Sequence, residues 1–408
     1  MLLFGNILLF ISIVGLLLMG WMEYFTPNGE RIGNFLNLTI YGWISFGILF
    51  LFYVGINILQ VVSRTLVLDI IPFEHQHPCA LMFIVSQVIG KILVNGSFFI
   101  TEVSSTTETI ERNSDLTSLI LLVASIFIVP ITSAITFWVA TENYTKKSKM
   151  QSFGEFILTG FKSLSPFNGN LMLTWLIVCF GWMAYVFFEQ CNVEMFNYFE
   201  YINSHNIKDS IFSPLYIKRI QKIIFLISQF IYCVYMFSKK QYPWYFMSIC
   251  NALTTLMCFL PLIISIITFE SDTLQLDRGG LTFIICIFCI FLIPSAISSA
   301  QLLSVPFALL KQISPTEYFG FYVGFLNCAI IVAQLASYIT SLFMLNNLHD
   351  DRISGDPYES NGSMIILLAG LSIGFYLLTC ILSVFIKRVY SSQNQSEYTE
   401  QMLNDSEE

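Results

Sequence analysis

Hydrophobic residues along this chain fall into long, almost uninterrupted runs that short polar segments separate. A membrane-spanning helix needs about 20 mostly apolar residues, and ten runs come close to that length or exceed it. They cover residues 2–22, 39–61, 79–101, 117–140, 170–188, 217–237, 244–268, 281–310, 319–345 and 363–386. The pattern predicts an all-α membrane protein with about ten transmembrane helices. The run at 281–310 holds Pro294 and Pro306, so we expect it to tilt or to break near them.

Composition supports the same fold class. Hydrophobic residues make up 55% of the 408 positions and charged residues 11%, whereas soluble domains are roughly 25% charged. A soluble fold of this size could not cover its surface with so few polar groups, but lipid accepts apolar side chains that face outward. The first run has no basic segment before it, which favours a retained helix over a cleaved signal peptide.

Several kinds of chemistry lack support in the sequence. It holds no nucleotide-binding fingerprint and no catalytic triad, so we do not expect an enzyme. Basic residues never gather enough for nucleic acid. Most of the ten cysteines lie inside apolar runs, where cysteine packs as a small hydrophobe, and the pair Cys286 and Cys289 has no second pair to complete a zinc site. His75 and His77 fit a solvated loop better than a metal site. We therefore expect no metal and no cofactor.

The lysine-rich segment 141–169 divides the runs into four before it and six after it. We expect an incomplete N-terminal bundle at 1–140, a cytoplasmic central loop at 141–169, a six-helix C-terminal bundle at 170–390 and a disordered acidic tail at 391–408. The basic residues at the span ends indicate, by the positive-inside rule, that both termini are cytoplasmic. A two-bundle transporter normally has six helices in each half.

Three stretches carry a family resemblance. Residues 57–72 read NILQVVSRTLVLDIIP, residues 181–189 read GWMAYVFFE, and residues 305–309 (VPFAL) are followed by GFLNCAIIVAQ at 324–334. They resemble the patterns N-x-x-Q-x-x-x-R-A-L-x-x-D, G-W-x-x-[FY] and P-F-A-L…G-x-L-N-x-A-I-x-x-x-Q of the sucrose/proton symporter family: plant sucrose transporters and their animal and fungal relatives. The third stretch is the most specific, because residue types, order and spacing all agree.

The resemblance implies a major-facilitator-type helical bundle. It further implies a secondary active transporter of a disaccharide or glycoside, sucrose- or maltose-like, that works by alternating access and is coupled to protons. Its partners would be the sugar, protons and the lipid bilayer, and its location the plasma membrane, with a vacuolar or other endomembrane as the alternative. On the family pattern the chain begins at the third span, which suggests a truncated or reduced relative. A non-transporting sensor or scaffold is therefore the alternative function.

The resemblance also assigns candidate substrate or coupling residues. Arg64 matches the family's essential arginine, although an arginine at the end of a span can also simply reach the interface. Glu189 stands where the family carries an acidic residue, and the alternative is an acidic side chain in an exposed loop. The remaining positions that fit the pattern are Asn57, Asp69, Asn327 and Gln334. Pro306, Gly320 and Gly324 suit helix breaks and close packing.

Three positions depart from the family pattern. Tyr53 occupies the place of the proton-coupling aspartate, and a phenol does not exchange its proton near neutral pH as a carboxylate can. Met195 and Phe196 replace an Arg-Glu pair. Lys91 stands where the family prefers asparagine, and it is the one formal charge deep within an expected span. Because a charge in a bilayer usually faces a cavity or a partner, we expect Lys91 to do so.

Overall fold

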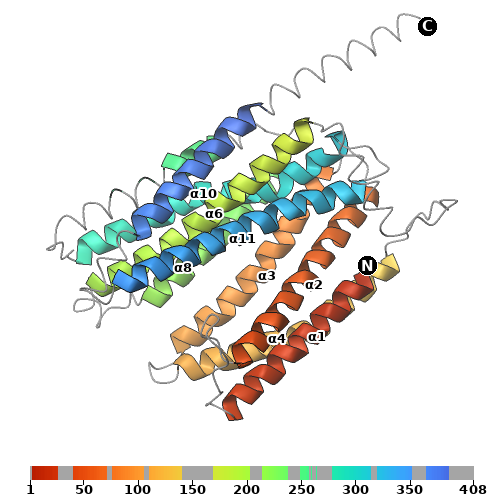
Figure 1. The fold of residues 1–408 in the computed structure, drawn as a ribbon, viewed down its shortest axis with the longest axis horizontal. Coiled ribbons are helices and arrows are strands. Elements are labelled where there is room, and N and C mark those ends of the chain that lie inside the picture. The colour runs from red at the N-terminus through yellow and green to blue at the C-terminus, as the bar shows by residue number, and fades with distance from the viewer. Residues whose placement is uncertain are drawn as a thin grey trace, which may run out of the picture. The chain divides into compact units, whose positions relative to one another are not determined.

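A computed structural model describes helical residues throughout the chain. The described residues are 2–25, 40–70, 76–104, 110–139, 169–202, 214–237, 249–256, 259, 263, 278–313, 319–351 and 364–385. They form α1 (Leu2–Phe25), α2 (Ile40–Ile70), α3 (Gln76–Ser104), α4 (Ile110–Val139), α6 (Gly169–Ile202), α8 (Pro214–Phe237), α10 (Arg278–Ile313) and α11 (Phe319–Asp351). A further long helix covers Met364–Phe385, and residues 249–256 form a shorter helical segment (Figure 1). The predicted central loop and acidic tail lie outside the described residues.

The described helices have the length and composition of membrane spans. Six contain segments that are long and apolar enough to cross a bilayer: Gly47–Leu66, Pro78–Ile100, Gly169–Met195, Arg219–Phe237, Gly320–Thr340 and Met364–Phe385. Shorter apolar segments lie in α1, α4 and α10. Large apolar side chains are exposed along these helices, with Trp138 at 86% and Leu93 at 65%. A helix satisfies the hydrogen-bonding groups of its own backbone, and an apolar outer surface lets it face lipid. The chain is therefore an integral, multi-pass membrane protein.

Several helices run past the ends of the apolar runs. Helix α2 continues to Ile70, so Arg64 and Asp69 both lie within it. Helix α6 continues to Ile202, which places Glu189 on a helix and excludes the exposed loop as its location. Helix α10 is continuous through Pro294 and Pro306, so it does not break at these prolines, and of the two alternatives the tilt stays a prediction. Because the helical hydrogen-bond pattern needs no lipid, a helix can continue where the hydrocarbon ends, and an apolar run marks only its embedded part.

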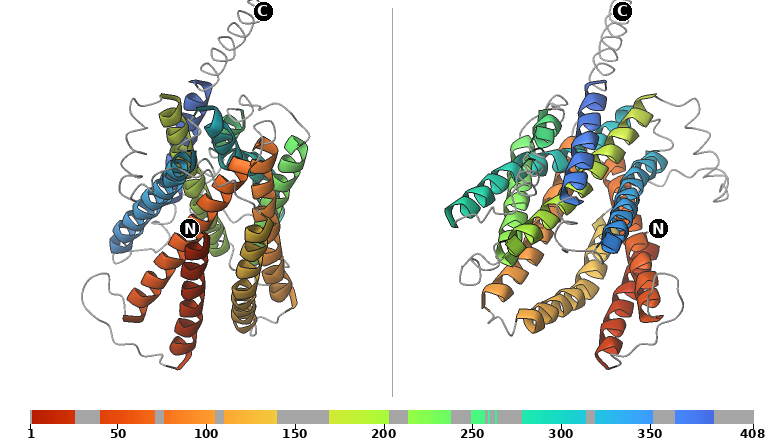
Figure 2. Two further views of the ribbon diagram at one scale, coloured as in Figure 1. Left: turned by 90° about the vertical axis from the view of Figure 1, so that its right-hand side faces the viewer. Right: turned by 60° about the vertical axis from the view of Figure 1, so that its left-hand side comes forward.

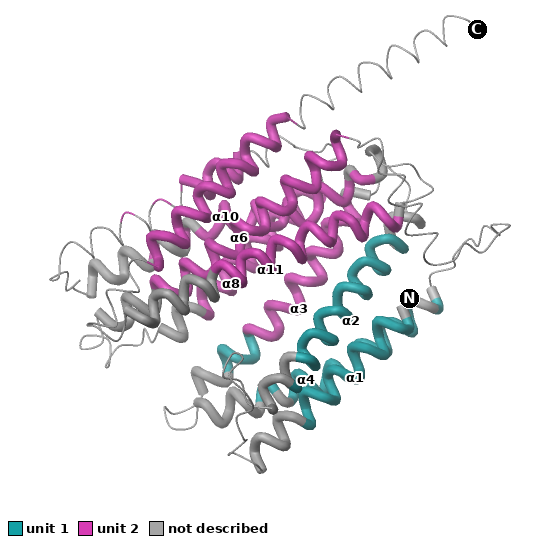
Figure 3. Tube along the Cα trace, in the orientation of Figure 1, with its two compact units in different colours: residues 1–72, 96–155 teal, residues 73–95, 156–408 magenta. Residues whose placement is uncertain are grey.

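The chain divides into two compact units, which Figure 3 colours separately. Unit 1 comprises residues 1–72 and 96–155, and unit 2 comprises residues 73–95 and 156–408. The first part of α3 therefore belongs to unit 2. The bundles expected from sequence were 1–140 and 170–390, so they differ from these units in where the first part of α3 is placed.

Unit 1 contains a close crossing of α1 and α2, which Figure 2 shows as a neighbouring pair. Glycine permits this approach, because a Cβ atom added at Gly55 would lie 3.2 Å from the backbone nitrogen of Leu9 and 3.3 Å from the carbonyl oxygen of Gly5. The hydroxyl of Ser133 on α4 donates a hydrogen bond of 2.9 Å to Asn6 Oδ1 on α1. Small residues and polar contacts between helices are typical of packing in membranes.

Unit 2 is built around α6, which packs against both α10 and α11, while α8 packs against α10. A Cβ atom added at Gly181 on α6 would lie 2.5 Å from Leu302 on α10. Trp175 on α6 donates to the carbonyl of Phe325 on α11 at 3.1 Å, and the rings of these two residues stack. Contacts between α6, α10 and α11 therefore hold the middle of this unit together.

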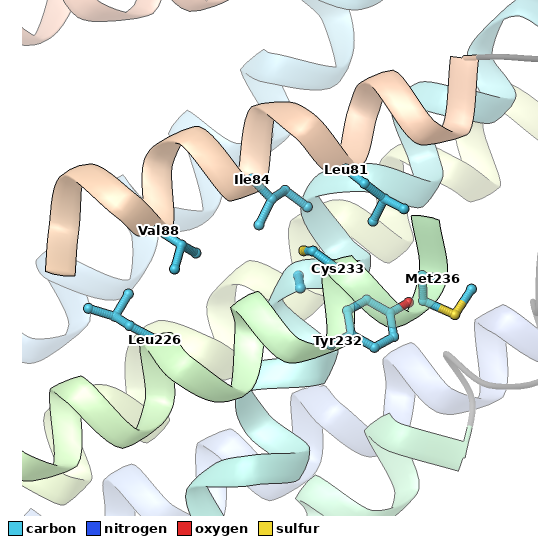
Figure 4. Packing of buried hydrophobic residues seen from close by; sticks show 8 residues of the cluster. Leu81, Ile84, Val88, Leu226, Tyr232, Cys233 and Met236 are labelled. Carbon is cyan, nitrogen blue, oxygen red and sulfur yellow. The ribbon is translucent and has the colours of Figure 1, made fainter. Parts of the chain in front are cut away.

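The first part of α3 packs on α8 within unit 2. Leu81, Ile84 and Val88 point from α3 toward α8 (Figure 4), where Leu226 and Cys233 lie in the same buried cluster. The α3 residues follow one another at intervals of three and four, which places them on one helix face. This packing fixes the α3 residues that follow Val88, including Lys91 and Asn95, relative to α8.

Candidate functional site: a cavity in unit 2

A cavity of about 280 Å³ lies among α6, α8 and α10 of unit 2. Its lining combines aromatic, apolar, charged and amide side chains: Tyr185, Phe188, Glu189, Asn192, Val193, Arg219, Gln221, Lys222, Phe225 and Leu292. Its volume is close to the lower end of the range for ligand pockets, about 300 Å³. Such a cavity suits a small solute.

Helix periodicity explains the contribution of α6. Tyr185, Glu189 and Asn192 are spaced by four and three residues, so they share one helix face, and Phe188 and Val193 lie beside them. The carboxylate of Glu189 is exposed on this face. The Oδ1 atom of Asn192 is buried and has no hydrogen-bond partner among the described residues. This face therefore offers acceptor groups to a bound solute.

Helix α8 contributes the cationic wall. Lys222 is exposed and Arg219 is half-buried, with Phe225 one turn further along the helix. Arg219 Nη1 donates to Asn95 Oδ1 on α3 over 3.4 Å, which is long for a hydrogen bond. The contact places Asn95 beside the cavity. This part of the wall therefore offers hydrogen-bond donors.

Lys91 lies on α3, four residues before Asn95, and its side chain is exposed. It interacts electrostatically with Glu189 and with Lys222. The fold thus brings Lys91 close enough to Glu189 for an electrostatic interaction, although the two candidates are 98 positions apart in the sequence. Glu189 thus places an opposite charge near Lys91, and the expectation that this lysine faces a cavity or a partner stays a prediction.

Aromatic rings form a continuous group at the cavity. The ring of Trp182 meets Tyr185 edge to face with centroids 5.5 Å apart, and the Tyr185 ring lies 6.0 Å from that of Phe225. The indole Nε1 of Trp182 is buried without a hydrogen-bond partner among the described residues. Rings of this kind give the wall flat apolar surfaces against which a sugar ring can pack.

The candidates on α2 lie in unit 1. Arg64 is buried, with 5% of its surface exposed. The side-chain amide of Asn57 donates to the carbonyl of Tyr53 at 2.8 Å, within its own helix. Tyr53 is 62% exposed, and Asp69 belongs to the last turns of α2, with no description of its side chain. These residues remain candidates that the structure places on one helix.

The candidates on α11 do not line the cavity. Asn327 is buried with 3% exposed, and Gln334 is half-buried. The close packing expected at Gly324 is not found among the described residues, none of which has an atom within 4 Å of a Cβ built at this position. Pro306 is buried inside the continuous helix α10, and Gly320 lies in the first turn of α11. Of the polar candidates, only Glu189 lines the cavity directly.

Sequence reasoning missed Arg219, Lys222 and Asn192. Both cations lie near the start of the run expected at 217–237, and α8, which begins at Pro214, carries them in its first turns. A signal for Asn192 existed in the spacing Tyr185, Glu189, Asn192, which continues one helix face beyond the apolar run. The contact between that face and α8 could not be found from one segment alone.

Comparison with known proteins defines the fold. No protein-family model matches the sequence, and no curated protein matches it significantly. Among solved structures, the chain is similar to a bacterial homologue of the iron transporter ferroportin in an outward-facing state, with a TM-score of 0.56 and 10% identity over 95% of this chain and 82% of that one. It is also similar to a double tryptophan mutant of XylE, with a TM-score of 0.54 and 14% identity over 93% of this chain and 82% of that one.

The chain therefore has an all-helical membrane fold of the major facilitator type. At such low identities the likeness establishes the fold alone, and the solute has to be argued from the cavity.

Proposed function

We propose that this chain is a secondary active transporter that carries a disaccharide or related glycoside across a membrane by alternating access. The observation that carries the proposal is the cavity of unit 2, where aromatic rings and hydrogen-bonding groups converge among apolar helices. The alternative of a sensor or scaffold gives no reason for such a lining.

The chemistry of the lining supports a sugar. A glycoside presents hydroxyl groups around its edge and carbon-bound hydrogens on its ring faces. Asn192, Gln221 and Glu189 offer hydrogen-bonding groups to the edge, while Tyr185 and Phe225 offer aromatic surface to a face. A mostly apolar pocket with a few placed polar groups is the usual form of a small-molecule site.

The fold supports a transporter. One protein of similar fold is described as a homologue of an iron transporter, and folds of this type host alternating access in general. The three sequence stretches described above resemble sucrose/proton symporters, which favours a sugar over a metal ion. We place the protein in the plasma membrane on the same resemblance.

Proton coupling is part of the proposal and rests on Glu189. Tyr53 stands in the place of the family's coupling aspartate, so that position holds no carboxylate. Glu189 is the carboxylate among the described residues that line the cavity, so a proton bound there would change the charge that the solute meets. Coupling would then lie in unit 2.

Uptake into proteoliposomes tests the proposal. The purified chain is reconstituted, and uptake of labelled sucrose, maltose and the anionic disaccharide lactobionate is measured with and without an inward proton gradient. We expect saturable uptake of at least one of them, which the gradient accelerates. Arg64→Ala should lose uptake while remaining folded. Uptake equal to that of empty liposomes for all three solutes would refute the transporter and favour the sensor or scaffold.

A further inference from the structure

A group of uncharged polar side chains is buried where α8, α10 and the segment 249–256 of unit 2 meet. We call it the buried polar cluster. Its members are Gln229 and Tyr232 on α8, Asn251 in the segment 249–256, and Ser295, Ser298, Ser299 and Gln301 on α10. None of them lines the cavity described above, so the cluster is a separate feature of the unit.

Contacts connect the cluster across its three elements. Two hydrogen bonds run between helices, from Gln229 to Ser299 and from Ser298 to Asn251. The hydroxyl of Tyr232 also interacts with the side-chain amide of Gln301. The polar groups of α8, α10 and the segment 249–256 therefore lie against one another inside the unit.

These contacts do not satisfy every polar atom of the cluster. The Nδ2 atom of Asn251 and the hydroxyl of Ser295 have no hydrogen-bond partner among the described residues. The amide of Gln301 presents two polar atoms, Nε2 and Oε1, and neither has a described partner at good geometry. The nearby hydroxyl of Tyr232 can serve one of the two at most. Three fully buried side chains therefore each keep at least one atom available for a hydrogen bond.

The depth of the cluster makes such atoms costly. Gln301 lies near the middle of the apolar segment Leu292–Ala308, where hydrocarbon offers no hydrogen bond. A buried polar atom without a partner loses the free energy of its hydration. Ser304, also on α10, avoids this cost because its hydroxyl donates to the carbonyl of Ala300 at 2.9 Å, one turn before it. Ser295 makes no such bond to its own helix among the described residues.

A ligand for these atoms has to be small, uncharged and able both to donate and to accept. Asn251 Nδ2 can only donate, whereas Gln301 Oε1 can only accept. The described members of the cluster include no carboxylate to hold a cation and no cationic group to hold an anion, and an uncompensated ion is expensive to bury. Water meets these requirements, and a buried water typically makes about three hydrogen bonds to groups of this kind.

We propose that the buried polar cluster is a binding site for ordered water molecules, which bridge α10 to the segment 249–256 at the depth of the hydrocarbon. They accept a hydrogen bond from Asn251 Nδ2 and bond to the Ser295 hydroxyl and to the Gln301 amide. Ser295 and Gln301 lie six residues apart, about 9 Å along the helix axis, so a single water does not bond to both. The inference is independent of the proposed function.

A pair of serine substitutions tests the inference through stability. Ser295→Ala and Ser304→Ala are made separately in the full chain, and their thermal midpoints of unfolding are compared in lipid nanodiscs. Ser304→Ala is the matched control, because that hydroxyl is also buried but bonds within its own helix. We expect the lower midpoint for Ser295→Ala, since the bound water loses a partner. If the hydroxyl of Ser295 were dry, alanine would remove an unsatisfied atom, and a midpoint equal to or above that of Ser304→Ala would overturn the proposal.

Radiolytic labelling of the unsubstituted chain tests the inference without a variant. X-rays convert bound water into hydroxyl radicals, which oxidise the side chains beside it and spare buried side chains that are dry. Cys250 precedes Asn251, interacts with Tyr232 and is 3% exposed, while Cys179 on α6 is 4% exposed and serves as the control. We expect mass spectrometry to show Cys250 oxidised several-fold faster than Cys179. Equal rates for the two cysteines would overturn the water site and leave the proposed transport untouched.

Discussion

Polar side chains inside unit 2 connect helices that apolar packing alone would leave free to slide. Gln229 Nε2 on α8 donates to Ser299 Oγ on α10 at 2.6 Å, and both side chains are buried. Ser298 on α10 donates to Asn251 in the segment 249–256. Ser372 donates to the carbonyl of Ala184 on α6 at 2.9 Å. At the scale of single residues, these bonds set the register of neighbouring helices.

The bond between Gln229 and Ser299 can be measured by a double-mutant cycle. Gln229→Leu, Ser299→Ala and the double variant are unfolded reversibly in mixed micelles, and their free energies of unfolding are compared. We expect a coupling energy of about 0.6 kcal/mol, and below about 1.7 kcal/mol, as for other hydrogen bonds between transmembrane helices. A coupling energy of zero would show that the two side chains do not interact.

Gly181 makes a second prediction at this scale. Alanine at this position would bring Cβ to 2.5 Å from Leu302, which is itself buried with 1% exposed. We expect Gly181→Ala to destabilise the protein by about 1–3 kcal/mol, the usual cost of overpacking. Gly374→Ala is the control, because no atom of the residues that the structure describes lies within 4 Å of a Cβ there and alanine favours the helix. Equal thermal midpoints for the two variants would contradict the close contact.

Among whole elements, the crossing of α1 and α2 depends on glycine, because the contact at Gly55 is with the backbone of the neighbouring helix. Gly55 allows the backbones of the two helices to approach, so a large side chain there must push them apart. We expect Gly55→Leu to lower the thermal midpoint of unfolding in detergent, at a cost of about 1–3 kcal/mol or more. Gly47→Leu, eight residues earlier on α2, would place its Cβ more than 4 Å from every described neighbour and should leave the midpoint unchanged. A lower thermal midpoint for Gly47→Leu than for Gly55→Leu would contradict the close crossing of α1 and α2.

The helices themselves could be predicted because backbone N–H and C=O groups in lipid must bond to one another, and a long apolar segment achieves this as a helix. Runs such as 319–345 and 363–386 correspond to α11 and to the helix Met364–Phe385. Their ends were less predictable, since α2 and α6 continue well beyond the apolar residues. The lining of the cavity was predicted only in part: Glu189 was recognised, but Arg219 and Lys222 were not. Their importance depends on which faces of α3, α6 and α8 meet, and a single helix pattern does not contain that information.

For the whole molecule, the central claim is that unit 2 encloses a water-accessible solute cavity within membrane helices. Tyr185 is a suitable probe because it lines the cavity and lies ten residues before the end of the span Gly169–Met195. At 1.5 Å per residue, this is about 15 Å along the helix. Leu377, 46% exposed near the middle of the span Met364–Phe385, provides a position on an apolar surface.

The most direct measurement is cysteine accessibility in membranes. The ten native cysteines are replaced, Tyr185→Cys or Leu377→Cys is introduced, and each variant is treated with a charged methanethiosulfonate reagent. We predict rapid modification at position 185, slowed by the solute that binds, and almost none at position 377. No modification at position 185, or modification equally fast at both positions, would contradict the cavity and with it the proposed transport.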